Sequence, residues 1–272
     1  MATMTTLEHK HSSDTPLSIN VNNVLAYKHL LIFLDQCDMN MCVDGEMLFF
    51  EKGTIVSIER GLKYSCNFKK HYLEGPPFRY IAIDQYTIKL LKDILILLYD
   101  YKLNESSLER KITDKVIGVW GDESVIRIFN LIANSLDNTR KAIKIAYMLS
   151  KSEHINKLVH SINISAAKTF TDKVRSIIEK DLSKKWRLNK IADEFNISEI
   201  TVRKRLESEN TSFHNVLMDL RMNRAIHLLH ENEKQIHQIS RLIGISSPSY
   251  FIKLFKDYYG VTPKQYIIYF RS

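Results

Sequence analysis

The chain has 272 residues, a formal net charge of +8 and a sequence pI near 9.2. Its hydrophobic fraction of 44% is sufficient for a core in each of two modest domains. The most apolar run, residues 90–99, contains Lys92 and Asp93, and the N-terminus lacks an apolar segment followed by a cleavage site. The composition therefore predicts a globular cytoplasmic protein with no membrane partner.

The three cysteines, Cys37, Cys42 and Cys66, are an odd number and form no CxxC pair. This pattern argues against a disulfide framework and against a four-ligand zinc site. We therefore expect reduced core cysteines, no metal and no other cofactor.

The N-terminal part is predicted to be rich in β-structure. Residues 1–16 are polar and lack periodicity, which indicates a mobile arm. From residue 17 to 84, short β-rich runs alternate with turn signals such as Asp44-Gly45 and Gly75-Pro76-Pro77. The spacing predicts an all-β sandwich or a small barrel.

The middle of the chain, residues 85–160, has the period of helices. Ile88, Leu91 and Leu95 share one face of the first helix, and a second helix is predicted to begin near Asp122. One or two more helices should follow before residue 160. Their apolar stripes suit packing on the β-domain, pairing with a second subunit, or both. Residues 161–169 are predicted to be a linker.

Positive charge is concentrated in the last part of the chain. Residues 166–272 hold 19 Lys and Arg against 12 Asp and Glu, whereas residues 1–165 hold 20 against 19. Such an excess favours an anionic partner. The same region has a helical pattern to its end, with breaks that predict about seven short helices.

Two stretches of this region, about 188–209 and about 236–259, repeat one pattern. In the first, Asn196 is suited to a positive φ at a tight turn, and Ser198 is suited to cap the next helix. In the second, Gly244 takes the turn, and Ser247 precedes a helix that opens with Pro248. Both stretches are predicted to be helix-turn-helix units.

The outward face of the second helix in each unit carries side chains that suit DNA. Cationic groups can donate to guanine, hydroxyls can bind base edges or phosphates, and an isoleucine can contact a thymine methyl group. The predicted base contacts are Ile200, Thr201, Arg203, Lys204, Ser249, Tyr250 and Lys253. The predicted phosphate contacts are Ser198, Arg205, Ser247 and Lys256. Double-stranded DNA is therefore the expected partner.

The segment "IADEFNISEITVRKRLESENTSFHNVLMDLRMNRAIHLL" and the closing "GVTPKQY" resemble the DNA-binding domain of the AraC/XylS family of bacterial transcription regulators. The resemblance covers residues 170–272. Within the family, "TDKVRSIIEKDLSKKW" is most similar to the enteric virulence regulators of the Rns, CfaD, RegA and ToxT type. Two positions depart from the family pattern: Leu206 stands where Phe is common, and Asn210 stands near the usual Gly.

The resemblance implies an α+β fold. Residues 17–84 would form a cupin-like, effector-binding β-barrel, residues 85–160 the dimerisation helices, and residues 170–272 an all-α domain of two units joined by one long helix. It also implies a sequence-specific regulator that activates virulence or adhesin genes through RNA polymerase. A small carboxylate, bicarbonate or a fatty acid, would be its effector.

An anionic effector needs cationic groups in its pocket. The candidates in the β-region are Tyr27, Lys28, His29, Arg60, Lys63 and Arg79. The sign of regulation stays open, because a repressor or a constitutive DNA binder without an effector would share these features.

An enzyme is not expected. A cupin metalloenzyme needs clustered histidines, but His29 and His71 stand alone. A DNA-repair methyl acceptor needs a reactive cysteine in a zinc cluster, which three scattered cysteines do not provide. The sequence also lacks a Gly-rich phosphate loop and a GxSxG motif.

Overall fold

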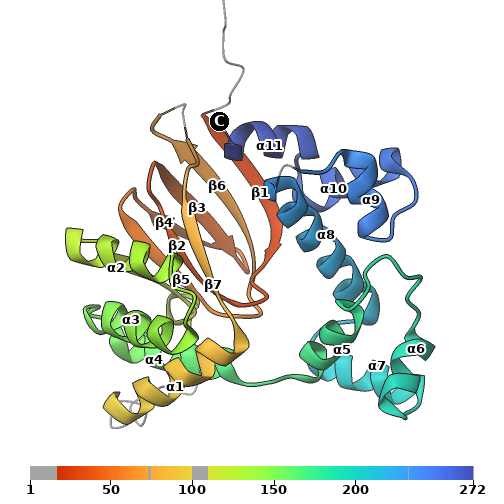
Figure 1. Ribbon diagram of the computed structural model, residues 1–272, viewed down its shortest axis with the longest axis horizontal. Helices are drawn as coiled ribbons and strands as arrows, with labels where there is room; N and C mark the ends of the chain where they lie inside the picture. Colours follow the sequence, from red (N-terminus) through yellow and green to blue (C-terminus); the bar gives the residue numbers. More distant parts are fainter. Residues whose placement is uncertain (1–16, 73–74, 100–109, 232, 272) are drawn as a thin grey trace, which may run out of the picture.

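The computed structural model describes residues 17–72, 75–99, 110–231 and 233–271 (Figure 1). The arm predicted for residues 1–16 lies outside them. The chain begins with two antiparallel sheets, continues with four helices packed on one of them, and ends in a helical region. The expected α+β class is thus confirmed.

The first sheet has one face in the core and one face in solvent. Its strand order is β1-β6-β3-β4. In β3, buried residues alternate with more exposed ones, and Met39 and Met41 point inward. The strands are β1 (Ser18–Leu25), β3 (Cys37–Val43), β4 (Glu46–Phe50) and β6 (Lys63–Lys70). Asp44 and Gly45, both with positive φ, form the tight turn between β3 and β4.

The second sheet is covered on both faces. Its strand order is β7-β2-β5-β8, and all five residues of β5 are buried. Val56 faces the first sheet, whereas Ile55 faces the helices. The strands are β2 (His29–Phe33), β5 (Thr54–Ile58), β7 (Arg79–Ile83) and β8 (Val116–Trp120). The molecule is therefore a three-layer assembly of sheet, sheet and helices in this part.

Four helices form the third layer. They are α1 (Gln85–Tyr99), α2 (Glu123–Ala133), α3 (Asn138–Ser150) and α4 (Ile155–Ala166), and a short 3₁₀ turn spans Ile112–Asp114. Leu91 and Phe129 pack against Leu31 of the sheet. Asp122 caps α2 by accepting a hydrogen bond from the Val125 amide, as its position in the sequence predicted.

Two boundaries differ from the sequence-based expectation. The stretch 85–160 contains strand β8 besides its helices, because "VIGVW" supplies the outer strand that β5 pairs with. The predicted linker, 161–169, is helical to Ala166, so only residues 167–169 separate α4 from the next helix.

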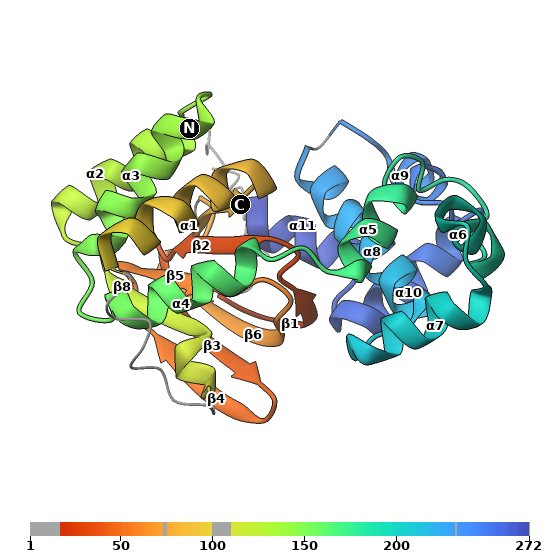
Figure 2. The ribbon, with the colours of Figure 1, turned by 90° about the horizontal axis from the view of Figure 1, so that it is seen from below.

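The C-terminal region has seven helices among the described residues, as the breaks in the sequence predicted. They are α5 (Phe170–Ile178), α6 (Leu188–Phe195), α7 (Glu199–Ser208), α8 (Phe213–Glu231), α9 (Ile236–Leu242), α10 (Pro248–Tyr259) and α11 (Pro263–Arg271). We call α6–α7 the first unit and α9–α10 the second unit. The long helix α8 joins them (Figures 1 and 2).

The two units belong to different cores. Phe251 and Phe255 of the second unit lie in the same apolar cluster as Met39 and Phe68 of the first sheet. The first unit packs with α5 and the beginning of α8 in a separate cluster that contains Val202. The second unit is therefore fused to the N-terminal domain, whereas the first unit is not.

Hydrogen bonds reinforce the fusion of the second unit. The Tyr269 hydroxyl donates to the Phe68 carbonyl at 2.9 Å, and the Asn23 side chain donates to the Tyr258 carbonyl at 2.8 Å. In Figure 1, α10 and α11 accordingly lie beside β1.

Polar contacts hold α5, which packs on the first unit, against the N-terminal domain. Arg60 forms an ion pair with Asp172 at 2.9 Å, and the Arg175 guanidinium lies 4.7 Å from the centre of the Tyr27 ring. These contacts bury less apolar area than a continuous core does, so they are the weaker of the two attachments.

Phe255→Ala should lower the free energy of unfolding by about 3–5 kcal/mol, because it leaves a cavity in the shared core. It should also destabilise the sheets themselves. In a Trp186→Phe background, Trp120 on β8 reports unfolding of the sheets in urea. Val202→Ala, in the separate core, is the control and should leave the Trp120 midpoint almost unchanged. Equal midpoint shifts for both variants would contradict the division into two cores.

Candidate DNA-binding surface and ligand cavity

The first unit has the turn and the cap that its sequence predicted. Asn196 ends α6 with φ +51°, in the left-handed region. The Ser198 hydroxyl accepts a hydrogen bond from the Thr201 amide and so caps α7. Asn210, which departs from the family's usual Gly, also has a positive φ of 54° and performs the same backbone role.

The outward face of α7 presents most of its predicted contact residues to solvent. Ile200 is 65% exposed, and Arg203 and Lys204 are exposed. Thr201 is half-buried beside the Ser198 hydroxyl at 2.9 Å. The Arg205 guanidinium lies 5.3 Å from the centre of the Phe170 ring, which orients it toward α5.

The second unit repeats this construction. Gly244 forms the turn with φ +75°, and the Ser247 hydroxyl accepts from the Tyr250 amide at 3.3 Å. Pro248 occupies the first turn of α10, where an N–H would have no helical partner. Ser198 and Ser247, predicted to bind phosphates, thus both serve as helix caps in this structure.

The outward face of α10 is equally accessible. Tyr250 is 56% exposed, and Ser249, Lys253 and Lys256 are exposed as well. The opposite face is buried through Phe251 and Phe255. Each unit therefore offers one polar, cation-bearing helix face, which suits entry into a major groove.

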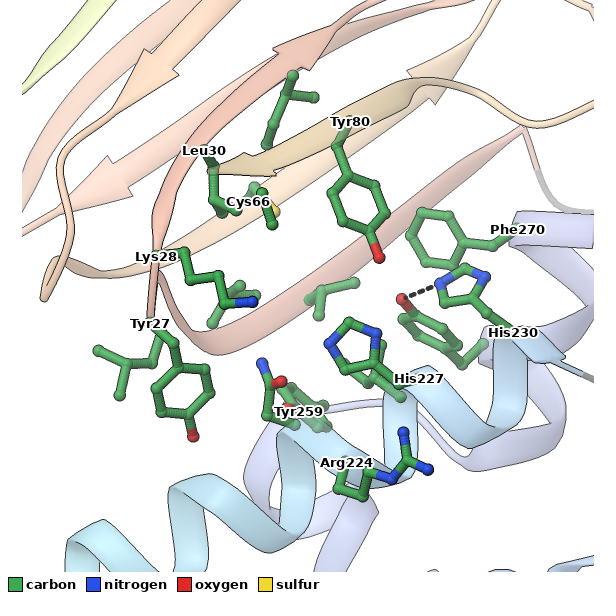
Figure 3. A pocket seen from close by; sticks show the side chains of 18 of the residues that line it. Tyr27, Lys28, Leu30, Cys66, Tyr80, Arg224, His227, His230, Tyr259 and Phe270 are labelled. Atoms are coloured by element: carbon green, nitrogen blue, oxygen red, sulfur yellow. Dashed lines mark hydrogen bonds between the residues drawn. The ribbon is translucent and has the colours of Figure 1, made fainter. Parts of the chain in front are cut away.

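A cavity of about 540 Å³ lies between the sheets and α8 (Figure 3). This volume is within the range of ordinary small-molecule sites. Its inner wall is apolar and is contributed mainly by β1, β2, β6 and β7. The apolar lining residues include Val21, Val24, Leu30, Ile32, Phe68 and Phe78.

The other wall of the cavity is polar and basic. It is formed by Lys28 from the N-terminal domain and by Arg224, His227 and His230 from α8. Figure 3 shows Lys28 extending from the sheet side toward α8. His230 Nε2 lies 3.0 Å from the Tyr266 hydroxyl, which orients its ring. The cavity therefore has a distinct apolar part and a cationic part.

Burial affects the acid–base groups around this cavity. It lowers the pKa of His227, and the charges of Arg224 and Lys28 act in the same direction. It raises the pKa of the Glu179 carboxyl, although Lys28 and Arg175 oppose the shift. Both shifts indicate that the site is partly dehydrated. Glu179 also lines the cavity, and Arg224 pairs with Glu231 at 3.5 Å, so acidic groups partly balance the positive charge there.

Tyr27 and Lys28, two of the six predicted effector residues, line the cavity. The Tyr27 hydroxyl is buried and has no hydrogen-bond partner among the described residues. A buried polar group without a partner is uncommon in a folded protein. Figure 3 shows this hydroxyl pointing away from Lys28 and His227, and the Tyr27 ring also packs against the apolar cluster of the first unit.

The other four predicted effector residues lie elsewhere and have structural contacts. His29 is buried between the Ser57 and Ser165 hydroxyls, at 2.8 and 2.9 Å, and burial lowers its pKa to about 3. Arg60 pairs with Asp172, as described above.

Lys63 and Arg79 are likewise engaged away from the cavity lining. Lys63 pairs with Asp219 at 3.6 Å, and Arg79 pairs with Asp35 at 3.0 Å. The Arg79 guanidinium also lies 5.0 Å from the centre of the Phe33 ring.

The cavity residues on α8 were not among the effector-binding residues predicted from the sequence. Arg224, His227 and His230 are three residues apart in turn, so they share one helix face. This spacing could have indicated a basic helix face that lines a site, but on its own it is equally typical of a helix face exposed to solvent. Only the packing of α8 on the sheets distinguishes the two.

Within the described part of the chain, no group of three or more His, Cys, Asp or Glu side chains is placed to hold a metal ion. In the same part, no helix combines the length and apolarity needed to cross a membrane.

Among known protein families, one matches the C-terminal region. The model of a family described as "Helix-turn-helix domain" matches residues 191–267. This match contains most of α6 and all of α7, α8 and the second unit.

Curated relatives match nearly the whole chain. The DNA-binding dual transcriptional regulator Rns of Escherichia coli is 41% identical, over 94% of this chain and 96% of its own. The transcriptional activator CfaD of Escherichia coli is 38% identical, over 98% and 100%. The virulence regulon transcriptional activator VirF of Shigella flexneri is 34% identical, over 99% and 100%.

Solved structures of ToxT from Vibrio cholerae show the same fold. One has a TM-score of 0.66 at 19% identity and covers 92% of this chain and 93% of its own. Another, with an unsaturated fatty acid bound, has a TM-score of 0.62 at 16% identity and covers 93% and 91%.

The relatives are named as transcription regulators and not as enzymes, in agreement with the prediction from the sequence. Their identity and coverage, together with the paired helix-turn-helix units, settle the family. The chain belongs to the AraC/XylS family of transcription regulators, in the group of enteric virulence regulators that contains Rns, CfaD and VirF.

Proposed function

We propose that the protein activates virulence or adhesin genes by binding promoter DNA and contacting RNA polymerase, under the control of a small carboxylate. The observation that carries the effector part is the cavity, which joins an apolar wall to a cationic one across the two domains. VirF and CfaD are named activators, which supports the sign of regulation.

The two units would read one face of a duplex. Successive major grooves on one face are about 34 Å apart, and α8 fixes the separation of α7 and α10. A shorter separation would require the DNA to bend toward the protein. The exposed side chains at the predicted positions would contact the bases. Arg203 on α7 and Lys253 on α10 are the cations expected to contribute most.

Arg203→Ala and Lys253→Ala should each reduce specific binding by about 1–3 kcal/mol, because each removes a donor to a base edge. Gel shifts on a duplex selected by the wild-type protein, and on its scrambled version, measure the effect. Arg127→Ala, an exposed arginine on α2, is the matched control and should bind normally. Equal losses on both duplexes would reassign the two residues to phosphate contacts.

A fatty acid fits the cavity better than bicarbonate does. Bicarbonate would occupy only the basic wall and would leave the apolar wall empty. A fatty acid would place its chain against residues such as Leu30 and Phe68, and its carboxylate near Lys28 and His227. ToxT was solved with an unsaturated fatty acid bound, which supports this choice.

Because the cavity is bounded by both domains, an occupant contacts both at once. It would change the stability of their closed arrangement and so the freedom of the two units to engage DNA. This is how the effector would control transcription.

Lys28→Ala should abolish the transcriptional response to dodecanoate, because the carboxylate loses a cationic partner that contributes about 1.5–3 kcal/mol. In vitro transcription with purified RNA polymerase measures the response, with bicarbonate as a parallel arm. Lys69→Ala, on the first sheet but outside the cavity lining, is the control. A Lys28→Ala protein that responds normally would remove Lys28 from the site, and a response to bicarbonate alone would replace the fatty acid.

We also infer a homodimer through the third layer. Leu97 on α1 is 85% exposed, and Ile143 and Tyr147, four residues apart on α3, are each 55% exposed. Helices α1 and α3 pack side by side, and we infer that these side chains together offer an apolar surface to a second copy.

Leu97→Glu should convert the dimer to a monomer, because a carboxylate cannot be buried in this surface without a partner. Sedimentation equilibrium gives the mass, and Arg127→Glu on the neighbouring α2 is the control. A wild-type protein that is monomeric at high concentration would refute the dimer.

Repression at some promoters is the second candidate. It is favoured by one observation: Rns, 41% identical to this chain, is named a dual regulator.

A further inference from the structure

A second cationic surface lies outside the helices that read DNA. It consists of the second half of the connection between α5 and α6 together with the first turn of α6, residues 183–190, which we call the basic loop. It contains Lys184, Lys185, Arg187 and Lys190, and all four side chains are exposed.

The backbone of the basic loop is held in place by several hydrogen bonds. The Trp186 indole donates to the Asp181 carbonyl at 2.8 Å, and the Ser183 amide donates to the Asp181 carboxylate at 3.0 Å. The Lys190 ammonium donates to the Lys185 carbonyl at 3.1 Å. The four charges are therefore presented by a defined backbone, so little conformational freedom would be lost on binding.

These cations lack acidic partners. Among the described residues, no carboxylate lies within ion-pair distance of any of the four. The carboxylate of Asp181, just before the loop, accepts from the Ser183 amide and hydroxyl instead. The corresponding position before α9 in the second unit differs, because Lys234 there pairs with Glu233 at 3.7 Å. The described part of the connection before α9 thus has no comparable group of unpaired cations.

The loop also touches the second unit. A Cβ at Gly244, in the turn before α10, would lie 3.2 Å from the carbonyl oxygen of Ser183, in the loop, and 2.6 Å from Nη2 of Arg221. The same Arg221 nitrogen, on α8, donates to the Lys184 carbonyl at 3.3 Å. The basic loop therefore starts at the junction of the two units and ends at α6, the helix that crosses the DNA backbone in a helix-turn-helix unit.

We propose that the basic loop binds the DNA phosphate backbone between the two major grooves that α7 and α10 read. Unpaired, exposed ammonium and guanidinium groups suit phosphate oxygens, and they carry no base preference. The junction places this contact where the duplex passes from one unit to the other. The loop would add affinity and fix the register of the protein on DNA, while the recognition helices supply specificity.

The test replaces the four cations by glutamine, in a variant carrying Lys184→Gln, Lys185→Gln, Arg187→Gln and Lys190→Gln. Binding to a duplex of about 30 base pairs, about three helical turns, is measured by fluorescence anisotropy at several salt concentrations. The slope of log affinity against log salt should fall in magnitude by about 0.9 for each lost phosphate contact, or roughly 3 to 4 in total. Discrimination between a selected and a scrambled sequence should remain.

The control removes the same formal charge from the N-terminal domain, through Lys89→Gln, Arg127→Gln, Arg140→Gln and Lys151→Gln. A loop variant whose slope falls no more than that of this control overturns the proposal. A second variant, Lys184→Arg with Lys185→Arg, should keep the wild-type slope, and a loss there would also overturn it. Phosphate ethylation interference should lose the positions between the two half-sites only in the glutamine variant.

Discussion

The structure depends on one continuous apolar contact, in which the second helix-turn-helix unit and the end of the chain share a core with the first sheet. Phe255 and Tyr269 are fully buried in that core, and the Tyr269 hydroxyl bonds to the backbone of β6. Because this contact is apolar and closely packed, the second unit is a fixed part of the N-terminal domain. The first unit packs on α5, which is attached to the N-terminal domain by an ion pair and a cation–π contact.

This asymmetry explains where the cavity lies. Helix α8 belongs to both cores, with Val216 in that of the first unit and Leu228 in the shared one. Its C-terminal half supplies Arg224, His227 and His230 to the cavity wall that faces the sheets. A molecule bound there contacts both the fixed part and the part that carries the first unit. The ligand site and the DNA-reading surface are thus connected through one helix.

Local chemistry made the DNA-binding half predictable from the sequence. Asn196, Ser198 and Gly244 each occupy a backbone position that few residue types tolerate, so the turns and caps could be placed to the residue. The N-terminal half was less predictable. Strands β3 and β6 contain Asp, Asn, Lys and Ser on their outer face, and β8 pairs with a strand about 60 positions earlier, so these depend on long-range contacts. Arg60, Lys63 and Arg79 were candidates for an anion, but acids elsewhere in the chain hold them in the fold.

The connection between α4 and α5 consists of three residues, 167–169, and its shortness has a mechanical consequence. Three residues span at most about 11 Å. If Arg60 and Asp172 separate, this tether still keeps the start of α5 within about 11 Å of the end of α4, and α8 still joins the first unit to the shared core. The effective concentration of the Arg60 and Asp172 surfaces relative to each other therefore stays high, and the two surfaces can pair again rapidly. Release of the first unit would be brief and local. A modest change in free energy at the cavity would be enough to alter the fraction of molecules in which the first unit is released.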